Sequence, residues 1–275
     1  MNTKLRTLLT LCLLSLPLVA QEPADGARDA RATLSADARA ALKHAREQAD
    51  AARKLGGPER KLALEQAAKL YDKAAGDFAA EPAAAASAAF SAAGLWRQHE
   101  SLALAEQAYL RAASLDAPRY AQRGLLGAAD MQRRQKRFEE AFATYGKAAA
   151  ADPGSARAQE ARLWQARVLQ GTGKLDQAIE GFQAALESAQ TASQVIEACN
   201  FLALAWIEKG DLDAAQRALE HADRTVEAAD DDDPIVTARL EKARDSMSAR
   251  RALQRARDRA NGAGQDAVRL DEARR

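Results

Sequence analysis

The feature that most constrains the fold is a set of small and large residues that recurs at nearly constant intervals along the chain. Five segments align without gaps, and successive segments start 38, 36, 37 and 37 residues apart. The four aligned columns are Leu64, Leu102, Phe138, Leu175 and Leu212; Ala67, Ala105, Ala141, Ala178 and Ala215; Tyr71, Tyr109, Tyr145, Phe182 and Leu219; and Ala74, Ala112, Ala148, Ala185 and Ala222. Steps of 3, 4 and 3 residues place the four positions of a segment on one face of an α-helix.

These columns predict helices that pack closely in pairs. Alanines allow two helix backbones to approach, and the larger residue between them fills the space beside the contact. Aromatic residues make up only 5% of the chain, and the alternation typical of strands is absent, so we expect no sheet. Breaks between the helical segments are expected at 56–58, 81–82, 117–118, 152–154, 171–173 and 210–211, where glycine, proline or aspartate occurs. Because one helical hairpin cannot bury such a face alone, neighbouring hairpins must stack.

The helix that precedes each of these segments carries a weaker pattern. Its small position is filled by Ala93, Ala129, Ala166 and Ala203, and a larger residue follows three positions later, as Trp96, Gln132, Leu169 and Trp206. Gln132 departs from the pattern because it is polar. Over about residues 58–229, the combined columns resemble the tetratricopeptide repeat (TPR). The resemblance implies a right-handed α-solenoid of stacked helical hairpins, in which the first helix of each hairpin lines a concave face.

We expect the repeat domain to cover residues 35–229 with about five hairpins, and Ser35 to cap its first helix. A capping helix is predicted over 230–260, where Asp233 can act as the N-cap and Pro234 can occupy the first turn. The acidic run 230–233 could alternatively bind calcium, but it lacks the spaced oxygens and glycine of a dedicated loop. Residues 261–275 are expected to form a flexible tail.

The N-terminus has the layout of a secretory signal peptide over residues 1–20. Lys4 and Arg6 precede an apolar run of eleven residues, which ends before Gln21. An uncleaved anchor is the alternative, although eleven helical residues span only about 16 Å. We therefore expect export to the periplasm or the extracellular space, a flexible lead-in over 21–34, and no transmembrane span in the mature chain.

The sequence offers few groups for catalysis. His44, His99 and His221 lie far apart and are expected on the solvated surface. Cys199 is expected to be a half-buried structural thiol, since its only possible partner, Cys12, lies in the signal peptide. Gly171-Thr172-Gly173-Lys174 lacks the preceding strand of a phosphate loop and is interpreted as a turn. We predict no enzyme activity, no cofactor and no metal site.

Charge says little about the partner. There are 40 basic and 39 acidic residues, which gives no reason to expect nucleic acid. The stretch 239–259 is locally basic, with a net charge of +5. It could contact an anionic surface, but we favour a solvated capping helix with internal ion pairs.

The resemblance to the TPR family places the candidate site on the concave face, which commonly binds extended or helical peptides. Projecting the register onto this chain gives Phe90, Arg97, Leu126, Asp130, Arg133, Arg134, Trp164, Arg167, Asn200 and Leu204 as candidate partner-binding residues. Arginine and tryptophan concentrate interface energy, and arginines on three successive first helices favour an acidic segment. We therefore expect a protein–protein interaction scaffold. The alternative is a helical binding module for a small molecule or an anionic envelope polymer, and the sequence does not indicate the oligomeric state.

Overall fold

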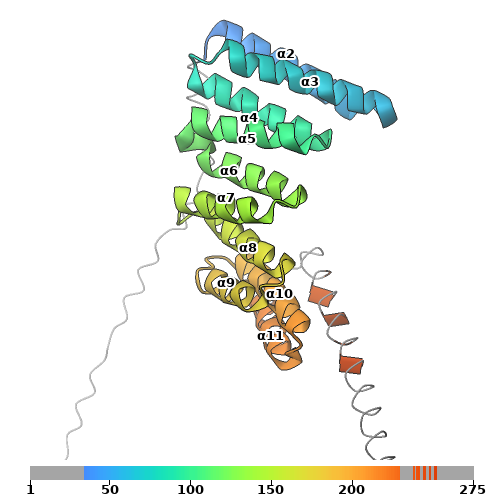
Figure 1. Ribbon diagram of the computed structural model, residues 1–275, viewed down its shortest axis with the longest axis vertical. Helices are drawn as coiled ribbons and strands as arrows, with labels where there is room; N and C mark the ends of the chain where they lie inside the picture. The colour runs from blue at the N-terminus through green and yellow to red at the C-terminus, as the bar shows by residue number, and fades with distance from the viewer. Residues whose placement is uncertain are drawn as a thin grey trace, which may run out of the picture.

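A computed structural model describes residues 34–229 and, beyond them, residues 238, 240, 241, 244, 245, 248, 251 and 252. Over 34–229 the chain forms ten helices and no strand: α2 (Ala36–Arg53), α3 (Gly57–Asp77), α4 (Pro82–Gln98), α5 (Leu102–Leu115), α6 (Ala117–Arg134), α7 (Phe138–Ala151), α8 (Ala156–Gly171), α9 (Leu175–Glu187), α10 (Ala192–Lys209) and α11 (Leu212–Ala229). Each helix packs mainly against the next one along the chain, so the helices form a stack with α2 at one end and α11 at the other (Figure 1). This arrangement confirms the predicted all-α, TPR-like solenoid.

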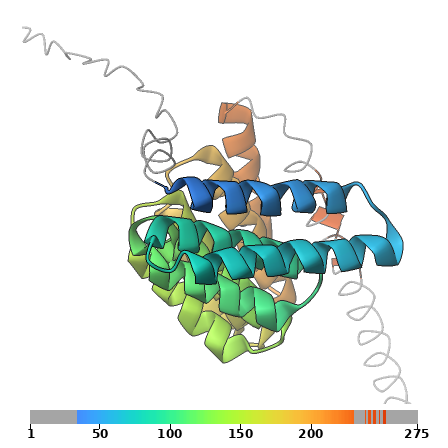
Figure 2. The same ribbon diagram turned by 90° about the horizontal axis from the view of Figure 1, so that it is seen from above.

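The predicted columns form the contacts between helices. The second helices of the five hairpins are α3, α5, α7, α9 and α11, and all ten of their column alanines are at most 3% exposed. The aromatic or leucine between them is buried in every unit, as is the small residue of each first helix from Ala93 onward. Seen from above, successive hairpins overlie one another with a progressive turn (Figure 2).

The helix boundaries follow from local chemistry. The Ser35 hydroxyl accepts a hydrogen bond from the Ala38 amide at 3.1 Å, which confirms the predicted cap of α2. Pro58 stands in the first turn of α3. An N–H at this position would have no acceptor within the helix, so proline costs no helical hydrogen bond there. α10 ends at Gly210, whose φ of 96° lies in the left-handed region that favours glycine.

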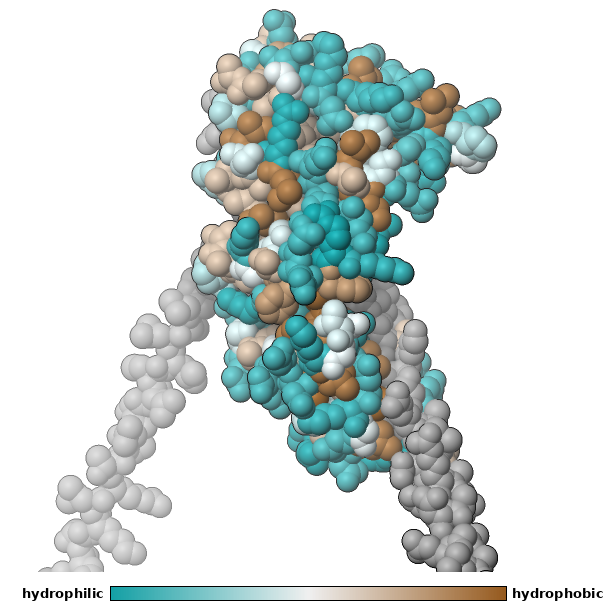
Figure 3. Space-filling model, in the orientation of Figure 1, coloured by the Kyte–Doolittle hydropathy of each residue, from teal (hydrophilic) through white to brown (hydrophobic). Residues whose placement is uncertain are grey.

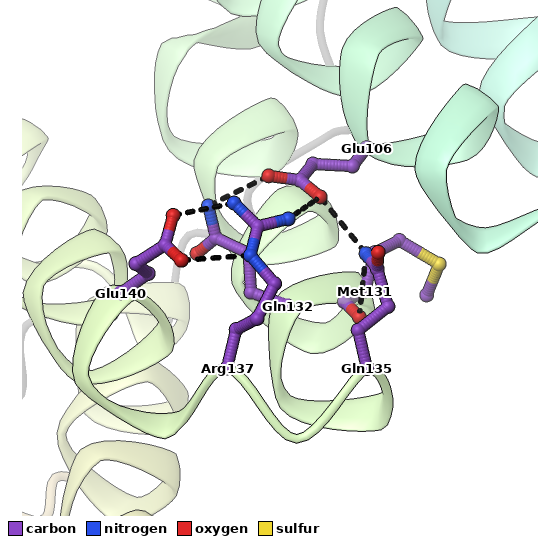
Figure 4. Close-up of polar contacts among 6 residues, drawn as sticks. All are labelled: Glu106, Met131, Gln132, Gln135, Arg137 and Glu140. Carbon is purple, nitrogen blue, oxygen red and sulfur yellow. Dashed lines mark hydrogen bonds and ion pairs between the residues drawn. The ribbon is translucent and has the colours of Figure 1, made fainter.

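Gln132 departs from the sequence pattern because it belongs to a polar network rather than to the apolar core (Figure 4). Its side-chain amide donates to Glu106 Oε1 at 2.9 Å, and the Gln135 amide donates to Glu106 Oε2 at the same distance. Arg137 completes the network by donating to Glu106 Oε2 at 2.5 Å and by pairing with Glu140. Glu106 is nearly buried, so these three donors replace the water that its carboxylate loses.

Several predicted segments lie outside the described residues. They are the signal peptide at 1–20, most of the lead-in at 21–34, the acidic run at 230–233, and the tail at 261–275. Of the predicted capping helix and its basic stretch, only eight scattered positions are described. These eight are helical; Leu240 is buried in the hydrophobic cluster that it shares with α8 to α11, and Arg244 pairs with Asp223 of α11. In the part of the chain that the structure describes, no helix combines the length and apolar character needed to cross a membrane.

Candidate functional site

The candidate site is a hollow of about 370 Å³ where three successive first helices, α4, α6 and α8, lie next to one another. We call it the central hollow. It is lined by Phe90, Arg97, Tyr109, Arg123, Leu126, Gly127, Asp130, Met131, Tyr145, Arg157, Glu160 and Trp164. It opens to solvent, and its lining is both apolar and charged. The face drawn in Figure 3 has the same mixed character, with small apolar patches among hydrophilic side chains along the stack.

Helical spacing brings these side chains together. On α6, Arg123, Leu126, Gly127 and Asp130 are separated by steps of 3, 1 and 3 residues and share one face. The second helices also contribute to the lining of the central hollow, through the column tyrosines Tyr109 and Tyr145. The repeat pattern that builds the core therefore also shapes the bottom of the hollow.

Gly127 allows Tyr109 to take this place. A Cβ built on Gly127 would lie 2.7 Å from two carbons of the Tyr109 ring, closer than van der Waals contact allows. Phe90 then meets the same tyrosine edge-on, with 5.4 Å between the ring centroids. A glycine on α6 thus lets two aromatic rings meet at one end of the hollow.

At the central hollow, two arginine side chains lie over the faces of aromatic rings. The Arg123 guanidinium lies 4.5 Å from the centroid of the Phe90 ring, and Arg133 lies 4.7 Å from that of Trp164. Arg133 also donates to Asp130 at 2.5 Å, so one of the two lining carboxylates already has a cationic partner. Burial raises the pKa of Tyr145 to about 12, so its hydroxyl, which is protonated at neutral pH in any case, stays protonated in alkaline solution as well.

The structure brings together about half of the ten predicted residues. Phe90, Arg97, Leu126, Asp130 and Trp164 line the central hollow, and Arg133 borders it over the Trp164 ring.

The remaining predicted residues lie elsewhere. Arg134 is exposed outside this lining, and Arg167 covers the Phe201 ring at 4.9 Å. Leu204 is half-buried against the C-terminal core. Asn200 is only 7% exposed among the packed residues of α10, so little of its side chain is available to a partner.

Sequence reasoning missed the other seven lining residues: Arg123, Gly127, Met131, Arg157 and Glu160 on the first helices, and Tyr109 and Tyr145 on the second. Arg123, Arg157 and Glu160 could have been found, since they stand three, seven and four positions before predicted residues on the same helix face. The sequence pattern places the tyrosines in the core. They are buried, as expected, and both also line the hollow.

A second hollow, of about 660 Å³, lies between α2 and α4. We call it the basic hollow, because four of its lining residues are cationic and none is acidic. The residues that line it are Leu34, Arg39, Leu42, Lys43, Arg46, Ala49, Arg53, Tyr71, Ser87, Phe90, Ser91, Gly94, Leu95 and Gln98. The two hollows share Phe90, so they are neighbours along the first helices.

Two predictions about reactive side chains need correction. His99 is not a solvated histidine: its side chain is 15% exposed, packs edge-on against Trp96 and lies 2.8 Å from the Ser101 hydroxyl. Cys199 is fully rather than half buried, and this burial raises its pKa to about 11. Among the residues with described positions, no three His, Cys, Asp or Glu side chains are grouped so that they could hold a metal ion.

Neither a protein-family profile nor a curated protein matches the chain. Solved structures do resemble it. A tetratricopeptide repeat protein from Parabacteroides merdae aligns with a TM-score of 0.56 and 16% identity, over 80% of this chain and 76% of the other. A MamA structure aligns with a TM-score of 0.51 and 16% identity, over 68% of this chain and 92% of the other. A double mutant of MamA aligns with a TM-score of 0.50 and 15% identity, over 70% and 98%. Together with the buried repeat columns, these alignments establish that the chain has the fold of the tetratricopeptide repeat proteins.

Proposed function

We propose that the protein is a non-enzymatic interaction scaffold that holds a segment of a partner protein in the central hollow. The observation that carries this proposal is the convergence of arginine and aromatic side chains from α4, α6 and α8 in one open hollow. Such residues contribute most of the binding energy at protein interfaces. The open shape suits a chain that passes through, whereas a small-molecule site usually encloses most of its ligand.

The partner segment is proposed to be acidic. Three arginines line the central hollow, Arg97, Arg123 and Arg157, against two carboxylates. Asp130 is already paired with Arg133, so the lining retains an excess of cations. These cations could bind the carboxylates of a partner segment. Apolar side chains of the same segment would find Phe90 and Trp164 at the two ends.

We also propose that this binding takes place outside the cytoplasm. The support is the basic start, apolar run and following Gln21 of the N-terminal segment. N-terminal analysis of protein from the envelope and medium should give a product that begins at Gln21. Full-length protein confined to the cytosol would reject export without affecting the binding proposal.

Binding is tested with the triple variant Arg97→Ala, Arg123→Ala, Trp164→Ala and the control Arg134→Ala. Arg134 is an exposed arginine on α6 outside the hollow lining, so the control removes a charge of the same kind nearby. Partners of the wild type are captured, cross-linked and mapped, and the mapped segment is then titrated as a peptide against each protein. We expect the triple variant to bind at least about tenfold more weakly and the control to bind normally. Equal affinity for all three proteins would show that the central hollow is not the binding site.

A further inference from the structure

The basic hollow carries a row of cations along α2. Arg39, Lys43, Arg46 and Arg53 stand at steps of 4, 3 and 7 residues, which places them on one face of the helix. At a rise of 1.5 Å per residue the row is about 21 Å long. Ser87, Ser91 and Gln98 of α4 add hydrogen-bonding groups on the opposite side.

These cations are not committed to strong internal partners. Within α2, Lys43 lies 3.9 Å from Glu47, and Arg46 and Arg53 lie 3.8 and 2.6 Å from Asp50. Such exposed pairs within one helix are weak, because water and salt screen them. Arg39 makes no ion pair with any residue in the described part of the chain. The row can therefore accept another anion at little cost.

The chain itself contains a matching anion. Asp230 to Asp233 are four consecutive carboxylates that begin directly after α11 ends at Ala229. Fully extended, four residues span about 13–14 Å, which fits within the cationic row. Four negative charges would then meet the four cations of the basic hollow.

The acidic run cannot reach the basic hollow of its own chain. Its first residue is attached to α11, whereas α2 lies at the opposite end of the stack of five hairpins (Figure 1). Packed helices are about 8–10 Å apart, so the stack is much longer than the reach of four residues. Any docking of this run must involve a second copy.

We propose that the acidic run 230–233 of one copy docks in the basic hollow of a second copy, which gives head-to-tail assembly. The two contacting surfaces differ, so every open complex keeps one free basic hollow at one end and one free acidic run at the other, and copies continue to add unless a ring closes. Because charge pairs dominate the contact, salt should weaken it. The proposal does not depend on the proposed function, since it concerns another hollow and the purified protein alone.

The test is sedimentation velocity of the full chain over a roughly 100-fold range of concentration, at low and high salt. We expect assemblies that grow with concentration at low salt and weaken at least about tenfold at high salt. A run variant carries Asp230→Asn, Asp231→Asn and Asp232→Asn, and keeps Asp233 for its predicted capping role. A hollow variant carries Arg39→Ala, Lys43→Ala and Arg46→Ala. Each variant alone should be monomeric, with unchanged helical content by circular dichroism.

Mixing the two variants provides the decisive measurement. The hollow variant retains an intact run and the run variant retains an intact hollow, so the mixture should form a one-to-one dimer and nothing larger. As a charge-matched control, Glu139→Gln, Glu180→Gln and Glu187→Gln remove three exposed carboxylates elsewhere and should leave assembly unchanged. A monomeric wild type at low salt overturns the proposal. So does assembly that survives in the run variant, which would mean that a different surface or anion is responsible.

Discussion

At the scale of single residues, Gly124 sets how closely α5 and α6 approach. A Cβ at this position would lie 2.6 Å from the carbonyl oxygen of Tyr109 and 2.9 Å from the Cβ of Ala113. We expect Gly124→Ala to lower the free energy of unfolding by about 1–3 kcal/mol, measured by urea denaturation, because the backbone must shift.

Gly94 provides the control for this prediction. It also stands inside a helix, α4, but a Cβ there would meet nothing within 4 Å. Gly94→Ala should therefore raise the free energy of unfolding by up to about 1 kcal/mol, through the better helix propensity of alanine. A loss of similar size in both variants would mean that the contact between α5 and α6 is not the cause.

The burial of the Cys199 side chain can be tested with a thiol reagent. Since the thiol is fully buried with a pKa raised to about 11, its reaction with a thiol reagent at pH 8 should be slow in the folded protein and fast in urea. The raised pKa favours the protonated thiol, so this contribution to stability is complete below the unfolded pKa of about 8.5 and is lost as the pH rises toward 11. Cys12→Ser leaves Cys199 as the only thiol for the assay. Labelling at the same rate in folded and unfolded protein would contradict the buried position.

At the scale of elements, the turns inside the last four hairpins share one conformation. The residue two positions before each second helix has a positive φ: 68° at Glu100, 63° at Lys136, 78° at Gly173 and 96° at Gly210. Glycine adopts this region freely, whereas other residues are strained there by about 1–2 kcal/mol. The repeat therefore extends to the backbone of its turns, although only two of the four turns use the residue type that suits them.

This difference predicts opposite effects of exchanging the residue types. Lys136→Gly should raise the free energy of unfolding by about 0.5–1 kcal/mol, since the relieved strain exceeds the added flexibility of the unfolded chain. Gly210→Ala should lower it by about 1 kcal/mol or more, because alanine is strained at a φ of 96°. Thermal unfolding of both variants and the wild type checks this pair of predictions. A shift of the melting temperature in the same direction for both variants would contradict the idea that backbone strain at the shared turn position decides their stability.

The sequence predicted the helices well because their determinants are local. Columns at steps of 3 and 4 residues specify a buried face. Ser35 specifies where α2 begins, and the Gly-Gly-Pro break specifies where it ends. The partner of Gln132 was not predictable in this way. Glu106 lies 26 residues earlier on a different helix, and nothing in the spacing shows that both side chains turn into the same buried space. The burial of Asn200 depends on tertiary packing for the same reason.

At the scale of the whole molecule, the location of the central hollow was easier to predict than its lining. The resemblance to a repeat family predicts a site on the first helices, and five of the predicted residues line one hollow. Where that hollow ends was not predictable, because the register alone does not say where the helices separate enough to leave space. Toward α10 they stay packed and cover Asn200, whereas between α2 and α4 they open into the basic hollow.

The stack also predicts an uneven distribution of stability along the chain. Each helix contacts mainly its neighbours in sequence, so an end hairpin loses only one interface when it opens, while a central hairpin must break two. Native-state hydrogen exchange followed by mass spectrometry should therefore show the slowest exchange in α5 to α7 and faster exchange in α2 and α3. Gly124→Ala, which acts at the contact between α5 and α6, should accelerate exchange in the centre more than in α10. Equal protection of all ten helices would instead indicate a single cooperative unit, and the description as a quasi-one-dimensional array of hairpins would then be wrong.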